Sequence, residues 1–370
     1  MKPYTVFLLI TILALALTAC TGATATSPTP PAMDPNMTGM EMNGMDMPGT
    51  MSSTPNPDSP EMPGMGEMKM EAPVPSEGVP LATETEGGQP LVYTLDGEVK
   101  VFELTAKPVR WPILADVYVT AWTYNGTVPG PMIRVTEGDK IRVILKNELP
   151  DATSIHWHGL TVPNNMDGVP PFTQNAIEPG ETFTYEFTAE VPGTYMYHSH
   201  VDTDRQIPIG LYAPLVIEPK EAQTNAVVDE MLMFSEWTIG ADGETYPSMP
   251  MAGAEPNYFT INGKAFPETQ SITVKVGDVV RLRLASIGQF THPMHLHGAS
   301  FQIVATDGYP VPEAAQWTKD TIAVNPGERY DIEFTFDEPG TWVLHCHVLH
   351  HVTNDNVEPG GLIYVINVEP

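Results

Sequence analysis

The sequence repeats one pattern, and this internal duplication limits the possible folds more than any other feature. Residues 179–200 match residues 326–347 without a gap, at an offset of 147 residues. A second pair of segments, 156–159 and 295–298, is related by an offset of 139 residues. Similarity at corresponding points of two segments is the mark of a duplicated structural unit. The sequence therefore predicts two homologous domains.

The duplicated part is predicted to consist of β-strands. From about Leu91 onward, short runs such as 140–145 alternate between apolar and polar residues and are separated by Gly, Pro and Asn. Alternation with a period of two predicts strands with one buried face, and regular turn residues favour a β-sandwich. Helical periodicity is limited to a short stretch near 312–315. We expect an all-β protein with domains at 91–220 and 226–370.

The first 20 residues have the features of an export signal. Lys2 precedes an uncharged apolar run from Val6 to Ala19, which is too short for a membrane span. The sequence Leu17-Thr18-Ala19-Cys20 also resembles a bacterial lipobox, in which the cysteine sulfur takes a lipid after cleavage. We expect residues 1–20 to be a lipoprotein signal peptide, Cys20 to be lipidated, and the protein to be anchored in the cell envelope. The alternative is an ordinary secretory signal.

The segment 21–90 is predicted to be a disordered linker. It is rich in Pro, Gly, Ser, Thr and Met and has very few aromatic or branched apolar residues. Thioether sulfur is a soft ligand that selects Cu(I), so the methionines are candidates for a flexible collector of cuprous ions. Compositional drift in a linker is the alternative. The methionines are Met33, Met37, Met40, Met42, Met45, Met47, Met51, Met62, Met65, Met68 and Met70.

Charge and cysteine content exclude some classes of function. The formal net charge of −29 disfavours nucleic acid and anionic lipid surfaces as partners. The chain has two cysteines, and a lipidated Cys20 cannot pair with Cys346, so no disulfide framework is available. The histidines on either side of Cys346 indicate that this cysteine binds a metal.

All 11 histidines fall into four clusters at equivalent points of the two repeats. On a strand, residues two apart project from one face and the residue between them from the other. His345 and His347 should therefore point together and Cys346 away from them. A thiolate with two imidazoles forms the trigonal site of blue copper, and His351 and His292 are the natural partners of Cys346.

The first repeat serves as an internal comparison for this site. The duplication aligns Cys346 with Ser199, His351 with Asp204 and His292 with Thr153, so the blue-copper residues are missing from the first repeat. The paired histidines are present in both repeats, four in each. Eight imidazoles are what a cluster of three copper ions requires.

These motifs together resemble those of a known family. HWHG, HSH, HPMHLHG and HCHxxxH, in this order, resemble the four copper motifs of the multicopper oxidases, and the match extends over 91–370. The resemblance is greatest to the small two-domain laccases. It implies two cupredoxin-like Greek-key β-sandwich domains, four copper ions per chain, and a homotrimer in which each trinuclear cluster lies between neighbouring subunits. Closed three-fold symmetry permits such a head-to-tail contact.

The resemblance also implies the ligands of each copper. The type 1 copper would be bound by His292, Cys346 and His351, and the type 2 copper by His156 and His295. The two type 3 coppers would be bound by His158, His198 and His347, and by His200, His297 and His345.

The implied reaction couples one-electron oxidation of a substrate, either Cu(I) or a phenolic or aromatic compound, to four-electron reduction of O2 to water. Electrons would pass from the type 1 site through Cys346 to His345 and His347. Asp167 resembles a family carboxylate near the type 2 copper, so we expect it to orient water and relay protons. A turn-forming role of the Asp167-Gly168 pair is the alternative.

The sequence departs from the family pattern after His351. Val352 occupies a position at which several relatives have an acidic residue for proton delivery, and the following loop is unusually long. Because no methionine follows Met294, we expect Leu362 or Val357 at the axial position of the type 1 site, which would raise the copper potential. We expect His350 to be solvated or hydrogen-bonded rather than a ligand.

Two other functions fit part of the sequence. A copper-sequestering, copper-resistance lipoprotein would keep the sites and turn over slowly. A copper nitrite reductase would also have two cupredoxin domains, but its type 1 cysteine lies in the first domain. Ser199 and the eight paired histidines argue against the second alternative.

Overall fold

The computed structural model describes residues 71–221, 224–247 and 255–370. The predicted signal peptide, Cys20 and the predicted cuprous-ion collector from Met33 to Met70 lie outside the described residues. Among the described residues, no helix has both the length and the apolar character that a membrane span requires.

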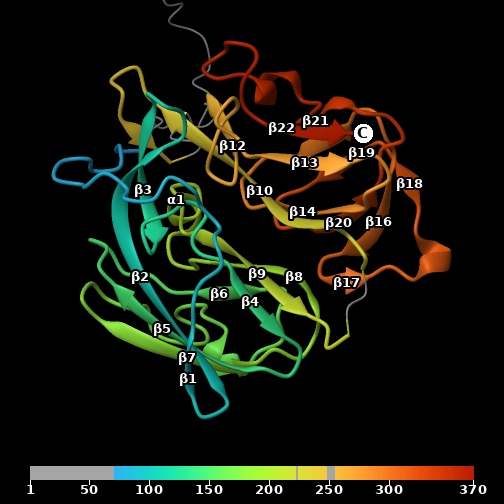
Figure 1. Ribbon diagram of the computed structural model, residues 1–370. Coiled ribbons are helices and arrows are strands. Elements are labelled where there is room, and N and C mark those ends of the chain that lie inside the picture. Colours follow the sequence, from blue (N-terminus) through green and yellow to red (C-terminus); the bar gives the residue numbers. More distant parts are fainter. Residues whose placement is uncertain (1–70, 222–223, 248–254) are drawn as a thin grey trace, which may run out of the picture. The chain divides into compact units, whose positions relative to one another are not determined.

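The described residues are almost entirely β-strands and loops, which confirms the predicted all-β class (Figure 1). Helical segments have at most four residues each, and one coincides with the short helical stretch expected near 312–315. They are α1 (Thr203–Gln206) and the 3-10 turns η1 (Asn164–Met166), η2 (Glu313–Ala315) and η3 (Leu349–Val352).

The first repeat forms two sheets. The larger has the order β1-β2-β5-β7 with β3 paired to β2, and the smaller has the order β4-β9-β8-β6. The strands of the larger sheet are β1 (Thr94–Asp96), β2 (Val99–Pro112), β3 (Tyr118–Tyr124), β5 (Lys140–Asn147) and β7 (Thr182–Thr188). Those of the smaller sheet are β4 (Ile133–Thr136), β6 (His156–His158), β8 (Gly193–His198) and β9 (Tyr212–Glu218).

The second repeat also forms two sheets. One has the order β11-β10-β14-β20-β16-β17, with β12 on β10 and β18 on β16. Its strands are β10 (Val228–Ile239), β11 (Thr245–Tyr246), β12 (Tyr258–Ile261), β14 (Val280–Ser286), β16 (Phe301–Thr306), β17 (Tyr309–Pro310), β18 (Thr318–Lys319) and β20 (Arg329–Phe334).

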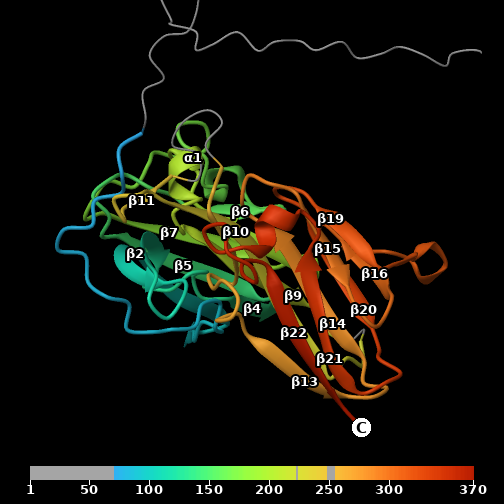
Figure 2. The same cartoon turned by 90° about the horizontal axis from the view of Figure 1, so that it is seen from above.

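The other sheet of the second repeat has the order β13-β22-β21-β15-β19 (Figure 2). Its strands are β13 (Ser271–Lys275), β15 (His292–Leu296), β19 (Thr321–Val324), β21 (Gly340–Cys346) and β22 (Ile363–Glu369).

The duplication is visible in the pairing of strands. The parallel pairs β2/β5 and β4/β9 of the first repeat correspond to β10/β14 and β13/β22 of the second. Strands that pair in parallel across long connections are the crossovers of a Greek-key arrangement. In each sheet, all strands either precede or follow the segment 219–227 in the sequence. We therefore propose a division into two domains at 91–220 and 226–370.

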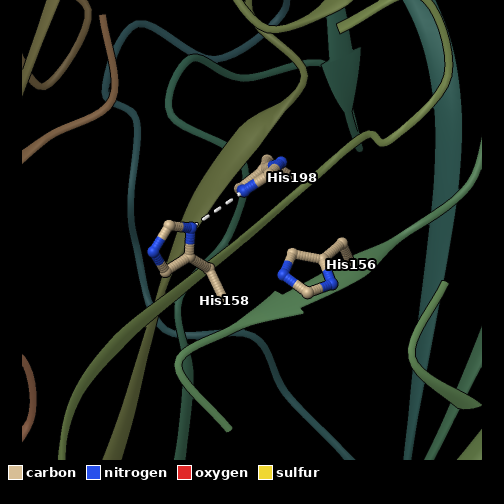
Figure 3. A group of neighbouring side chains, drawn as sticks. All are labelled: His156, His158 and His198. Atoms are coloured by element: carbon tan, nitrogen blue, oxygen red, sulfur yellow. Dashed lines mark hydrogen bonds between the residues drawn. The ribbon is translucent and has the colours of Figure 1, made fainter. Parts of the chain in front are cut away.

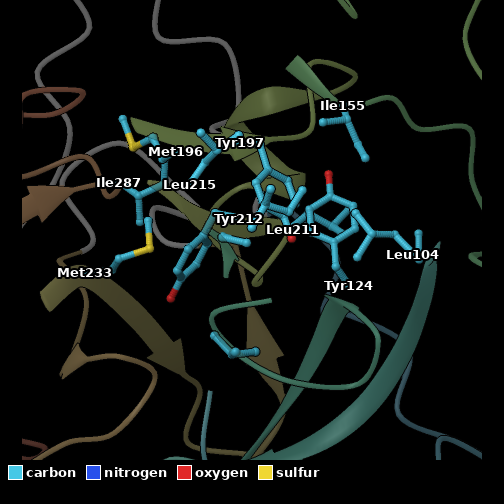
Figure 4. Packing of buried hydrophobic residues seen from close by; sticks show 14 of the residues in the cluster. Leu104, Tyr124, Ile155, Met196, Tyr197, Leu211, Tyr212, Leu215, Met233 and Ile287 are labelled. Carbon is cyan, nitrogen blue, oxygen red and sulfur yellow. The ribbon is translucent and has the colours of Figure 1, made fainter. Parts of the chain in front are cut away.

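The two repeats share a continuous interior. Met233 and Ile287 of the second repeat pack with the aromatic core of the first, beside Tyr212 and Met196 (Figure 4). The indole N–H of Trp111 donates to the carbonyl oxygen of Gly263 at 2.7 Å. The repeats are therefore joined by buried contacts as well as by the connecting chain.

The predicted linker is wrong for its last 20 residues. Val74 is fully buried in the first core, and its backbone N–H donates to the carbonyl oxygen of Thr245 at 2.7 Å. Leu81 and Pro90 form bridges to Arg110 and Met132. The segment 71–90 lies against the folded part because Val74 and these backbone groups find partners there, although its composition resembles a linker.

Candidate metal centres

The structure brings His292, Cys346 and His351 together in the second repeat. His292 begins β15, Cys346 ends β21, and His351 lies in η3. The Sγ atom of Cys346 is 3.5 Å from Nδ1 of His351 and 3.9 Å from Nδ1 of His292, and the two Nδ1 atoms are 3.1 Å apart. All three residues are buried. A thiolate and two imidazoles at this spacing can hold one soft metal ion.

Aromatic rings enclose this group and keep water from it. Phe259 stacks on His351 with ring centroids 4.2 Å apart, and Phe234 lies edge-on to His292. Burial raises the pKa of Cys346 to about 12 and lowers the pKa of His351 to about 3. Without a metal the thiol therefore keeps its proton at neutral pH, whereas His351 is neutral. A bound cation would displace the thiol proton.

Four histidines gather in the first repeat, at the ends of β6 and β8. The register of the two strands places His156 opposite His198. Nδ1 of His158 lies 3.1 Å from Nε2 of His198, and His156 lies beside this pair (Figure 3). The ring of His200 is centred 5.4 Å from that of His156.

The equivalent four histidines gather in the second repeat, on β15 and β21 and the residues that follow them. His295 pairs with His345 across the two strands. Nε2 of His297 lies 3.0 Å from Nε2 of His345, and the ring of His347 is centred 5.8 Å from those of His295 and His345. The alternation predicted for 345–347 is present, because Cys346 faces the other centre.

The two sets of four histidines do not form one cluster within the chain. Over the described residues, every close contact between these rings joins members of the same set. Each set contains one pair of nitrogens about 3 Å apart and two further rings. An arrangement that uses all eight rings at one centre would need a second copy of the chain.

Burial and backbone hydrogen bonds prepare several of these rings for metal binding. Burial lowers the pKa of His158 to about 4 and of His198 to about 3, and it also lowers the pKa values of His297 and His345. The neutral ring is the form that binds a metal. Nδ1 lies 2.8–3.0 Å from a backbone carbonyl oxygen in four rings, which leaves Nε2 available to a metal. These rings are His156, His198, His295 and His345.

Asp167 lies beside the first set of histidines. Its backbone carbonyl oxygen is 2.9 Å from Nδ1 of His156, and Oδ1 of its carboxylate is 3.4 Å from the same nitrogen. Gly168 adopts a φ of +78°, so the Asp-Gly pair also forms the turn that the sequence offered as the alternative. The two roles are compatible in this geometry.

The equivalent pocket of the first repeat is filled by neutral side chains. The hydroxyl groups of Thr153 and Ser199 both donate to Oε1 of Gln206, at 2.9 and 2.6 Å. All three residues are buried. Gln206 lies two residues beyond Asp204, the residue that the duplication aligns with His351, and no sequence signal identified it.

The structure separates the two residues proposed for the axial position. Val357 is 66% exposed and lies in the loop after His351, so it does not line the buried thiol, and that prediction is wrong. Leu362 is fully buried in the same core as Cys346, and its carbonyl oxygen accepts the N–H of Cys346 at 3.1 Å. Nε2 of His350 lies 3.2 Å from the carbonyl oxygen of Pro256, in line with the expected hydrogen-bonding role.

Comparison with known proteins identifies the family. Two family models, both described as multicopper oxidase, match residues 105–222 and 242–357. The crystal structure of a blue copper oxidase from Nitrosomonas europaea has the same fold, with a TM-score of 0.68 and 39% identity over 72% of this chain and 85% of that chain. The chain belongs to the multicopper oxidase family, and the predicted cupredoxin-like fold is confirmed.

Curated relatives include a multicopper oxidase and a copper resistance protein. The multicopper oxidase MmcO of Mycobacterium tuberculosis is 33% identical over 65% of this chain and 52% of its own length. Copper resistance protein A of Pseudomonas syringae is 46% identical over 41% of this chain and 24% of its own length. The chain thus spans about half the length, or less, of these relatives.

Proposed function

We propose that the protein is a multicopper oxidase that couples one-electron oxidation of a reducing substrate to four-electron reduction of O2 to water. The observation that supports this most is the segment 345–347, in which Cys346 faces two buried histidines and its two neighbours join the second set of histidines. The peptide backbone therefore links a one-electron site to an oxygen site within a few bonds. When bound, copper would supply reversible one-electron redox chemistry at both sites.

The donor atoms fit copper. We assign a type 1 copper to His292, Cys346 and His351, because a thiolate with two imidazoles suits this metal. We assign the type 2 copper to His156 and His295. For the type 3 coppers we assign His158 and His198 with His347, and His297 and His345 with His200. The short N–N distances within His158/His198 and His297/His345 support these pairings.

The separation of the two histidine sets supports a homotrimer with each trinuclear cluster between subunits. One copy would supply His156, His158, His198 and His200, and its neighbour would supply the second set. In a closed ring of three copies, every copy makes this head-to-tail contact with both of its neighbours. Such an assembly would bind four copper ions per chain.

The surroundings of the type 1 site favour electron transfer from substrate through His351. His292 is fully buried, and its Nε2 atom lies 2.8 Å from a carboxylate oxygen of Glu236. His351 lies in η3 and is 5% exposed, whereas His292 and Cys346 are 0% exposed. A small reducing substrate could therefore approach the ring of His351 more closely than any other ligand.

Protons for water formation would come through Asp167. Its carboxylate lies 3.4 Å from His156 and is one-third exposed, so it can exchange protons with solvent while staying beside the oxygen site. Val352 offers no acid for a second route, so Asp167 would be the principal relay.

The central prediction concerns Cys346. In Cys346→Ser, the hard hydroxyl cannot replace the thiolate, so the holoprotein should lose its intense visible absorption and nearly all O2 uptake with a reductant. Metal analysis, absorption spectra and an oxygen electrode measure these changes. Ser199→Ala, at the equivalent position of the first repeat, is the matched control and should keep both properties.

Wild-type behaviour distinguishes the alternatives. A protein that binds four copper ions yet consumes no O2 with reductants would be the copper-sequestering lipoprotein. Turnover of nitrite without O2 consumption would favour the nitrite reductase. The pocket occupied by Thr153, Ser199 and Gln206 argues against the nitrite reductase, because that enzyme has its thiolate there.

For the substrate we propose Cu(I), with phenols and aromatic amines as the alternative. The methionines from Met33 to Met70 offer soft ligands, and copper resistance protein A is among the relatives. We further propose lipidation of Cys20 and residence in the cell envelope, where such a protein would meet copper ions.

The substrate assignment predicts the effect of a deletion. Removal of residues 33–70 should lower kcat/KM for Cu(I) at least several-fold and leave oxidation of a phenol unchanged. Of these two substrates, only Cu(I) binds to thioether sulfur. Steady-state O2 uptake with each substrate measures this. Equal losses with both substrates, or no loss with Cu(I), would refute the collector.

A further inference from the structure

A buried carboxylate touches one of the proposed copper ligands from outside the metal site. Glu236 lies in the second half of β10 and is 1% exposed. Its Oε1 is 2.8 Å from Nε2 of His292, whose Nδ1 faces Cys346. The backbone N–H groups of Gln289 and Phe290 also donate to this carboxylate, at 3.0 and 3.4 Å. Two backbone N–H groups and one imidazole nitrogen therefore surround this carboxyl group, and both of its oxygens have a partner.

The chain between β14 and β15 is shaped to admit this carboxylate. A Cβ atom at Gly288 would lie 1.8 Å from Oε2 of Glu236, so only glycine permits the contact at that position. Glu236 and His292 come from different strands and are 56 residues apart in the sequence. Their contact is therefore a product of the fold of the second repeat, and neither residue's neighbours in sequence indicate it.

The negative charge of Glu236 has no basic partner in the described part of the chain other than His292. An ionised carboxylate removed from water is costly unless it is paired. A copper ion on Nδ1 of His292 would place positive charge on the other side of the same ring. The carboxylate and the proposed metal would then offset each other through the imidazole.

We propose that Glu236 is a positioning residue for the thiolate copper centre and that its buried charge lowers the potential of that copper. It accepts the Nε2 proton of His292 and so directs the lone pair of Nδ1 toward the site shared with Cys346. A nearby negative charge also stabilises Cu(II) more than Cu(I). This proposal rests on the type 1 ligands proposed above.

The two histidines proposed to bind the type 1 copper are contacted by different kinds of side chain. His292 contacts a buried carboxylate, whereas His351 is packed between Phe259 and Phe290. The charge thus acts on the side of the centre away from the proposed path of electrons from substrate. Its expected effect is on the energy of the copper site and on its affinity for copper, with the approach of substrate unchanged.

The test is Glu236→Gln in the full-length holoprotein, because glutamine keeps the size and an acceptor oxygen but removes the charge. We expect the Cu(II)/Cu(I) ratio at a fixed potential to fall at least ten-fold, which is a rise of about 59 mV for a one-electron couple. Affinity for the thiolate-bound copper should fall about 10- to 100-fold, as is usual when the hydrogen-bond partner of a metal ligand is lost. Redox titration of the visible band and competition with a chelator measure the two effects.

The matched control is Glu230→Gln, on the same strand. Glu230 accepts a hydrogen bond from the hydroxyl group of Tyr364 at 2.6 Å and does not contact the proposed copper ligands. This variant should keep the wild-type potential and affinity. Equal values for wild type, Glu230→Gln and Glu236→Gln would overturn the proposal. A wild-type protein without the thiolate-to-copper band would instead refute the ligand assignment.

A measurement on the wild type serves if Glu236→Gln does not fold. In reduced holoprotein with 15N-labelled histidine, the Nε2 proton of His292 should exchange slowly with D2O because a buried carboxylate accepts it. The Nε2 proton of His351 should exchange faster. Fast exchange at both rings would overturn the proposal.

Discussion

At the scale of residues, the buried histidines link metal binding to acid sensitivity. Burial lowers the pKa values of His158, His198 and His351 to about 3–4, whereas in the unfolded chain they lie near 6.5. The unfolded state therefore binds more protons between these limits, and acid favours unfolding. The stability that depends on neutral rings is complete above about pH 6.5 and is lost as the pH falls toward 4.

We accordingly predict that copper-free protein loses stability on acidification. Each of the three rings can contribute up to about 1.4 kcal/mol per pH unit between about pH 6.5 and its folded pKa. Urea unfolding at pH 7.5, 6.5, 5.5 and 4.5 should give a free energy that falls slightly over the first step and more steeply thereafter. A free energy that is flat from 7.5 to 4.5 would contradict the prediction.

At this scale the sequence predicted which histidines lie together and which of them lie beside Cys346, but it did not predict their surroundings. Alternation along 345–347 sufficed to place Cys346 opposite its two neighbours. Glu236 and Gln206 were missed because each acts through a residue on another strand or in another turn. A single Glu within the second half of a strand and a Gln in a four-residue helix have no periodic signal of their own.

At the scale of elements, the segment 71–90 belongs to the folded part of the molecule. We predict that a chain beginning at residue 71 keeps the unfolding temperature of the full-length protein. Removal of 71–90 as well exposes the pocket of Val74 and its backbone bond to Thr245, at a cost of about 2–4 kcal/mol.

Thermal unfolding of the two truncated chains measures this difference. Val74→Ala in the chain beginning at 71 is a finer variant and should account for about 1–2 kcal/mol of the loss. Identical unfolding temperatures for chains beginning at 71 and 91 would show that the segment does not contribute. Composition could not predict its order, because the contact depends on a distant backbone carbonyl.

At the scale of the whole molecule, a buried arginine joins the two repeats near the first set of histidines. Arg329 on β20 is 3% exposed, and its guanidinium donates to the carbonyl oxygens of Thr194, Gly327 and Asp307 at 2.8–3.3 Å. Thr194 belongs to β8 of the first repeat. A Cβ atom at Gly159, which follows His158, would lie 2.6 Å from Nη2 of Arg329, so the two repeats meet tightly here.

We predict that Arg329→Met destabilises the protein by about 1–3 kcal/mol, because one buried and two half-buried carbonyl oxygens lose their donor. It should also weaken copper binding at the oxygen site more than at the thiolate site. Chemical unfolding and absorption spectra measure the two effects. Arg142→Met removes a surface arginine paired with Asp96 and Glu186 and should change stability by less than about 1 kcal/mol. Equal effects of the two variants would contradict the prediction.

The overall architecture was predictable and the joint between the repeats was not. Alternating strands and the internal repeat predicted two β-sandwiches because both signals are patterns in the sequence itself. The shared core around Met233 and Ile287 depends on how the two sandwiches meet, to which no repeat or period refers.

The hydrogen-bonded group of Thr153, Ser199 and Gln206 makes the duplicated molecule functionally asymmetric. With the proposed ligands, electrons enter each chain at one site, because the equivalent pocket of the first repeat is filled by neutral side chains. Within the described part of the chain, no second thiolate site could compensate for damage at Cys346. The duplication would thus supply two sets of histidines for the oxygen site but only one entry site for electrons.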